Sequence, residues 1–144
     1  MIIENRKSFI KKLKLNSNIN KLIFAKTLFA LHKNPRDEFL ILVANTVMNK
    51  FVADAEMMDE IPSIVKILTS FGCWKNVKFM ENIDLKNTLF QKCLKIADDL
   101  LNGNFDEKFG GILCFHKKSE SHLLTKNVKP KFEVDDFSFF DVYM

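Results

Sequence analysis

Apolar and polar residues alternate along this chain in a pattern that predicts helices first and strands near the end. The stretch Phe39–Phe51 is apolar on nearly every side, as is typical of a helix buried among other elements. Asn34 and Pro35 favour a helix start just before it, because Asn caps helices and Pro suits the first helical position. The two acidic residues that follow, Asp37 and Glu38, favour the positive end of a helix dipole. We therefore expect the central helix of the domain here.

Shorter helices are expected on both sides of this central helix. Apolar residues recur at helical spacing over residues 20–32, 61–72 and 84–101, and residues 53–58 continue the central helix weakly or form a loop. Ser17 and its two Asn neighbours offer caps for the first of these helices, and Asp84 offers one for the last. Gly103 has the position of a glycine that ends a helix. Residues 73–83 read as a loop.

The C-terminal part changes character and predicts a small antiparallel sheet. Short apolar runs at Ile112–Phe115, Phe132–Val134 and Phe137–Val142 read as strands, and Asp135 with Asp136 reads as a turn. Helices followed by a separate group of strands indicate an α+β fold, here a mostly helical domain with a small C-terminal antiparallel β-sheet.

Composition adds limits to this picture. The 144 residues fit one domain, which we place at residues 20–144 after a basic N-terminal segment at residues 1–19. Five cations surround three apolar residues in the segment RKSFIKKLK, which suits either a solvated helix or one that touches a membrane or nucleic acid. Fifteen Phe stand against one Trp and one Tyr, which indicates a core with little polar chemistry.

Charge and cysteine content exclude several classes of site. The net charge of +4 permits an anionic partner without requiring one, and we expect no nucleic acid. The three cysteines are scattered, which argues against a disulfide framework and a zinc site. No acidic and histidine cluster has metal-ligand spacing, so we expect no metal and no cofactor. No signal peptide or transmembrane run is recognisable, so we expect a cytoplasmic protein as synthesised, reaching a cell wall or periplasm only by another route.

One stretch resembles a known family. The segment AKTLFALHKNPRDEFLILVANTVMNK, from Ala25 to Lys50, aligns without a gap to the motif A-R-T-x-Y-A-E-A-R-G-E-P-x-E-G-Q-x-A-V-A-N-V-V-L-N-R of SleB/CwlJ-type cell wall hydrolases. Outright matches include Thr27, Glu38, Asn45 and Asn49. Three further blocks follow in the family's order: SFGCW at 70–74, GGILCFH at 110–116 and VDDFSFFDVY at 134–143.

The resemblance implies a lysozyme-like domain acting on or binding the glycan strands of peptidoglycan. Family members cut the strand with one essential glutamate as general acid, and this chain has Leu31 at that position. Leucine cannot transfer a proton, so the resemblance implies a pseudoenzyme. The His of the closing motif is also replaced, by Phe137. No catalytic residue is therefore expected at the family position.

Three other residues are candidates for a groove. Glu38 is the best fallback acid, with Asp37 next, although both also suit the start of a helix. Trp74 holds a family position and suits either sugar stacking or the core. His116 matches a family His and suits either a groove or a structural hydrogen bond. His32 and His122 are expected to be exposed and inert.

Three hypotheses remain open from the sequence. The first is a SleB-like domain, catalytically degenerate, that binds peptidoglycan glycan strands. The second is a non-enzymatic structural or interaction protein, of phage or symbiont type, that uses a lysozyme-like scaffold to hold a protein partner. The third is a live hydrolase in which Glu38 or Asp37 has taken over as the acid.

Overall fold

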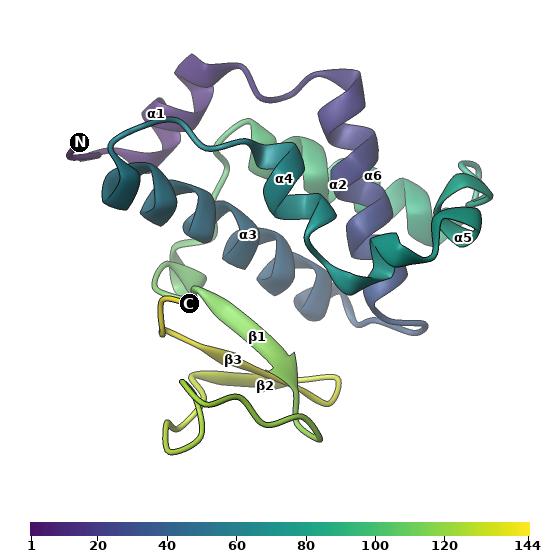
Figure 1. Ribbon diagram of the computed structural model, residues 1–144. Helices are drawn as coiled ribbons and strands as arrows, with labels where there is room; N and C mark the ends of the chain where they lie inside the picture. Colours follow the sequence, from purple (N-terminus) through teal and green to yellow (C-terminus); the bar gives the residue numbers. More distant parts are fainter.

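The computed structural model describes residues 1–144 and shows an α+β fold, as the pattern predicts (Figure 1). Six α-helices and two short 3₁₀ segments precede a three-stranded antiparallel sheet. The helices are α1 (Arg6–Leu13), α2 (Asn18–Leu31), α3 (Asp37–Met58), α4 (Ile64–Thr69), α5 (Val77–Glu81) and α6 (Thr88–Leu101). The 3₁₀ segments are η1 (Gly72–Lys75) and η2 (Glu107–Phe109), and the strands are β1 (Cys114–Lys117), β2 (Phe132–Val134) and β3 (Phe137–Phe140).

Helix α3 is the centre of the domain, as expected. It lies between the sheet and the other helices (Figure 1). Thirteen of its residues are buried. One of them, Phe39, packs on Phe137 and Phe139 of the sheet at ring distances of 4.8 and 6.1 Å. The helix continues past Phe51 because Val52 and Ala55 also reach the core and hold the weakly patterned end in place, although Met57 and Met58 are exposed.

The sheet has the order β1-β3-β2, and β2 and β3 form the predicted hairpin. Val134 pairs with Phe137, which leaves Asp135 and Asp136 as a two-residue turn. Both turn residues have positive φ, 51° and 65°, as a type I′ turn requires. Asp tolerates this conformation better than most residues, so the turn prediction is confirmed with its physical reason.

Local polar residues start most of the helices. Asn5, Ser17, Ser63 and Asn87 each accept a hydrogen bond from a backbone N–H of the first turn. Gly103 follows α6 with φ of +83°, and a Cβ there would lie 2.7 Å from the carbonyl oxygen of Lys7. The glycine therefore permits both the helix end and the close approach of α1.

Several boundaries differ from the expected ones; for example, β1 begins at Cys114 rather than Ile112, and β3 ends at Phe140 rather than Val142. Helix α3 begins at Asp37, not at Pro35, and its cap residue Arg36 makes no side-chain cap bond. Helix α6 begins at Thr88, because Asn87 caps it, whereas Asp84 accepts from Lys86 N in the preceding turn. The expected loop at 73–83 contains η1 and α5, which are too short to show a hydrophobic period.

The basic N-terminal segment shares the core of the domain. Ile10 of α1 is fully buried in the same hydrophobic cluster as α3. The lysines of α1 at positions 7, 11 and 12 remain exposed. None of the helices combines the length and the hydropathy that a membrane span requires.

Candidate functional site

A cavity of about 650 Å³ opens where the end of α2 meets the end of β1 and the β2–β3 turn. We call it the Leu31 cavity. Its lining residues are Ala30, Leu31, His32, Lys33, Lys117, Lys118, Ser119, Asp135, Asp136 and Phe137. These residues come from three separate parts of the sequence, so only the folded chain forms the cavity.

The apolar lining of the Leu31 cavity comes from α2 and β3. Leu31 is the last residue of α2 and is half-buried. Phe137 is almost buried, at 6% exposure, and packs on Phe39. Both positions hold an ionisable residue in the family motif described above, and both hold an apolar one here. No group on this part of the lining can give or take a proton.

Asp135 supplies the one carboxylate that is held firmly at this cavity. Its side chain is 7% exposed, although it lies in a hairpin turn. Oδ2 accepts a hydrogen bond of 2.7 Å from the Arg36 backbone N–H, and Oδ1 lies 3.3 Å from the Arg36 Nε. Oδ2 therefore accepts a hydrogen bond, and Oδ1 takes part in an ion pair. The contact ties the hairpin to the start of α3 and satisfies the backbone N–H of Arg36, the cap residue of this helix.

His32 lies beside Asp135 and is not the exposed, inert residue that was expected. Its side chain is 29% exposed, and Nε2 lies 3.8 Å from Asp135 Oδ2. The ring packs edge-on against Phe39 at 5.4 Å and tilted against Phe137 at 5.9 Å. The expected full exposure was therefore wrong: His32 follows the last residue of α2 in extended backbone, and its ring packs on α3 and on the sheet.

Lysines form the rim of the Leu31 cavity. Lys33, Lys117 and Lys118 are all exposed and all line it, together with Ser119. Lys118 lies 3.6 Å from Glu133, whereas Lys33 and Lys117 take part in no salt bridge. Two ammonium groups at the rim therefore have no acidic partner in the protein.

The acids proposed as fallbacks lie elsewhere. Glu38 is exposed in the first turn of α3 and lines none of the cavities described here. Asp37, its neighbour, is exposed and forms an ion pair of 2.6 Å with Lys92. The carboxyl groups at the Leu31 cavity are instead Asp135 and Asp136, which the sequence indicated only as turn residues.

Trp74 and His116 both make structural hydrogen bonds. Trp74 is half-buried in η1, and its Nε1–H donates to Thr27 Oγ1 at 2.9 Å. His116 lies 2.8 Å from Thr125 Oγ1 through Nε2, and its ring stacks on Phe140 at 5.0 Å. Neither residue lines the Leu31 cavity.

A second cavity, of about 250 Å³, lies at the other end of β1 and is mostly apolar. We call it the Phe71 cavity. Its lining includes Phe71, Phe115, Val47 and Ile67, with Lys50 as its one charged side chain. Phe71 and Phe115 stack at 5.8 Å, and Phe115 lies 6.0 Å from Phe137 of the Leu31 cavity. Strand β1 thus adjoins both cavities.

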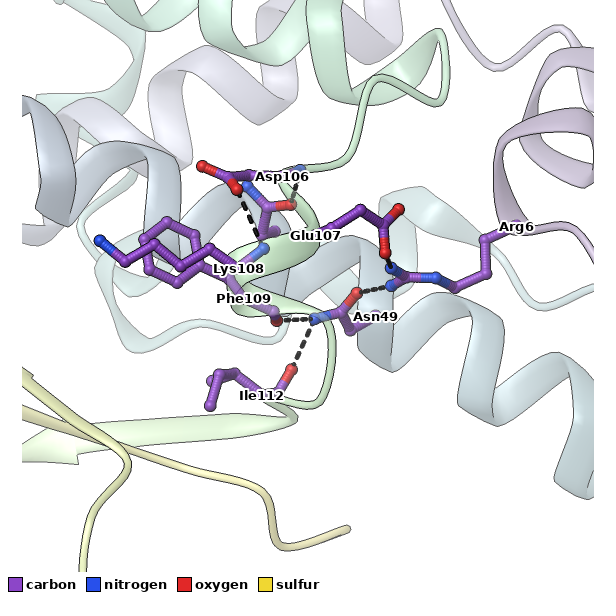
Figure 2. A network of polar contacts seen from close by, with 8 residues as sticks. Arg6, Asn49, Asp106, Glu107, Lys108, Phe109 and Ile112 are labelled. Carbon is purple, nitrogen blue, oxygen red and sulfur yellow. Dashed lines mark hydrogen bonds and ion pairs between the residues drawn. The ribbon is translucent and has the colours of Figure 1, made fainter.

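A network of polar side chains fixes the loop before β1 to the middle of α3 (Figure 2). Asn49 is buried, and its Nδ2 donates to the carbonyls of Phe109 and Ile112 at 2.8 and 2.9 Å. Arg6 of α1 donates to the Asn49 side-chain oxygen and pairs with Glu107. The Asn45 side-chain oxygen accepts from Asp106 N at 2.9 Å. We call this group, which also includes the Asp106–Ile112 loop, the asparagine network.

The three thiols do not have the character of nucleophiles. Burial raises the pKa of Cys93 from 9.0 to about 12. Burial also raises the pKa of Cys73 and the pKa of Cys114. Thiolate chemistry needs the opposite shift, so these side chains belong to the core rather than to a site. No group of three or more His, Cys, Asp or Glu side chains lies close enough together to hold a metal ion.

Comparison with known proteins gives no independent assignment. No protein-family model, no curated protein and no solved structure matches the chain.

Proposed function

We propose that this chain is a SleB-like cell wall hydrolase domain that binds glycan strands of peptidoglycan and no longer cleaves them. The observation that carries the proposal is the meeting of Leu31 and Phe137 at one cavity. They stand at the positions of the family's general-acid Glu and closing-motif His, near opposite ends of the matched region. An alignment made by chance would have no reason to bring these two positions together.

Contacts between the motif blocks give further support. Thr27 of the first block accepts from Trp74 of the second, and Asn49 of the first holds Ile112 of the third. Phe115 of the third block lies 5.2 Å from Phe139 of the fourth, ring to ring. Residues of the four motif blocks therefore contact one another across the fold. Such contacts are expected if the motif describes the packing of a common domain.

Loss of cleavage follows from the missing proton donor. Glycosidic bond cleavage needs a carboxylic acid at the leaving oxygen. Leu31 has no proton to give, Glu38 lies outside the cavity, and Asp135 is occupied as an acceptor for Arg36. Asp136 is exposed in the turn and lacks the partly apolar setting that a general acid needs. What remains is a cavity with an apolar lining and a polar rim, which suits a sugar bound without reaction.

The test combines binding with restored chemistry. The purified chain should sediment with insoluble peptidoglycan and should release no muropeptides from it. Leu31→Glu should gain muropeptide release, whereas Leu31→Gln, of the same shape but without a carboxyl group, should gain none. Circular dichroism checks that both variants fold, which is expected because the position is half-exposed.

Each of the other outcomes contradicts part of the proposal. Muropeptide release by the unaltered chain would mean that another acid is active, and loss of that release in Glu38→Gln would identify it. Absence of binding to peptidoglycan would overturn the proposal, and co-purification of a protein partner would then favour the interaction-protein hypothesis. Binding without any gain in Leu31→Glu would separate Leu31 from the family's acid position.

A further inference from the structure

The charges around the Leu31 cavity favour one class of ligand. Three lysines line it, and two of them, Lys33 and Lys117, have no acidic partner. Of the two aspartates in the lining, Asp135 is already matched by the Arg36 guanidinium and backbone N–H. Only Asp136 and, through Lys118, Glu133 oppose the lysines. The rim is therefore positive where a ligand would enter.

The position of the two unpaired lysines is set by separate elements. Lys33 follows the end of α2, and Lys117 is the last residue of β1. They approach the same opening from the helical part and from the sheet. An anionic group at the opening could thus contact both ammonium groups, while the apolar surface of Leu31 lies below.

We infer that the Leu31 cavity recognises a carboxylate carried by the glycan strand, held between Lys33 and Lys117. This inference rests on the proposed function and adds the chemical class of the ligand. The peptide branches of peptidoglycan carry carboxylates, so a peptide-bearing strand would bind here better than an uncharged glycan. Recognition of a carboxylate needs no proton transfer, which fits a site without a general acid.

The test compares two double variants of equal charge. Lys33→Gln with Lys117→Gln removes the two rim charges, and Lys11→Gln with Lys12→Gln removes two exposed charges of α1 that form no salt bridge. Binding is measured by sedimentation with peptidoglycan freed of wall phosphate polymers. The first variant should bind about fivefold more weakly, as expected for two partly solvated ion pairs, and the second should bind like the unaltered chain.

Chemical blocking of the ligand provides the second arm. Amidation of the carboxyl groups of peptidoglycan should weaken binding of the unaltered chain about fivefold relative to untreated peptidoglycan. Amidation should not weaken binding of the rim variant, Lys33→Gln with Lys117→Gln. Raised salt should weaken binding of the unaltered chain more than binding of the rim variant.

The outcomes separate this inference from the proposed function. Equal losses in the two double variants, or no effect of amidation, would overturn the inference and leave peptidoglycan binding in place. Dependence on the rim lysines that is seen only with walls retaining their phosphate polymers would identify phosphate as the anion and overturn it too. Failure of the unaltered chain to bind any peptidoglycan would overturn both.

Discussion

Helix α3 meets the C-terminal part of the chain in two very different ways. Along its middle, Asn45 and Asn49 reach across to the loop before β1 and satisfy three backbone groups there. Near its start, the lining of the Leu31 cavity is apolar at the two positions where the family motif has ionisable residues. The first region is closed and fully bonded, and the second is open.

This difference separates the motif positions that stabilise the fold from those that line the cavity. The matched asparagines supply both a donor and an acceptor to backbone groups of the loop. Every buried side-chain polar atom of the chain has a hydrogen bond. Replacing Asn49 would leave two buried carbonyls without a donor, and replacing Asn45 would leave the Asp106 N–H without its acceptor. The replaced positions at the Leu31 cavity hold apolar side chains that pack on neighbouring apolar residues, Leu31 half-buried and Phe137 against Phe39, so no buried polar group depends on them. We therefore expect stability to depend on the asparagine network and ligand binding on the Leu31 cavity.

The largest expected effect is that of Asn49→Ala. It removes donors to the buried carbonyls of Phe109 and Ile112 and the acceptor for Arg6. The free energy of unfolding, measured by urea denaturation, should fall by about 3 kcal/mol. As a control, Asn82→Ala removes an exposed amide and should cost less than about 1 kcal/mol. Similar losses in the free energy of unfolding in the two variants would show that Asn49 stabilises the fold no more than an exposed amide does.

The next largest expected effect comes from breaking the contact between Asp135 of the hairpin and Arg36 at the start of α3. Asp135→Ala loses the bonds to Arg36 and adds strain at positive φ, so the free energy of unfolding should fall by about 2 kcal/mol. Asp135→Asn keeps an oxygen and tolerates the turn, so it should lose about 1 kcal/mol. Asp136→Asn, in the same turn but exposed, is the control and should change little. If Asp135→Asn left the free energy of unfolding unchanged, the contact between Asp135 and Arg36 would not stabilise the fold.

A smaller effect tests whether Trp74 belongs to the fold or to a binding surface. Trp74→Phe keeps an aromatic ring and loses the donor to Thr27, so the free energy of unfolding should fall by about 1 kcal/mol. Sedimentation with peptidoglycan should stay unchanged. Weaker binding at unchanged stability would assign Trp74 to ligand binding rather than to the stability of the fold.

The smallest expected effect on stability is that of the rim lysines. Lys33→Gln with Lys117→Gln removes two exposed charges without partners, so the free energy of unfolding should change by less than about 0.5 kcal/mol. The measurement is urea denaturation of the same preparation used for binding. A loss comparable to that of Asn49→Ala would remove the distinction between a folding region and a binding region.

Features with a strong local signal could be predicted from the sequence. The central helix, the other long helices and the Asp135-Asp136 hairpin follow from apolar spacing and turn chemistry. Contacts between distant segments could not. Asp135 contacts the start of α3 from the far end of the chain, so no local pattern indicated that α3 would begin at Asp37. The same is true of His32, whose burial depends on Phe137.

The site shows the same division. The resemblance singled out Leu31, and the structure has it at a cavity, but the lysine rim and the buried Asp135 emerge only on folding. Glu38 looked suitable because it is acidic and near Leu31 in sequence. The turn between α2 and α3 separates the two, and Glu38 faces solvent.

The close contact at Gly103 has a consequence for the order in which the chain folds. The space between this residue and the Lys7 carbonyl admits a hydrogen atom and no methyl group, so α1 is seated against the end of α6. During synthesis from the N-terminus, that seat does not exist until about a hundred residues have followed α1. Helix α1 can therefore reach its final position only after α6 and Gly103 have been synthesised.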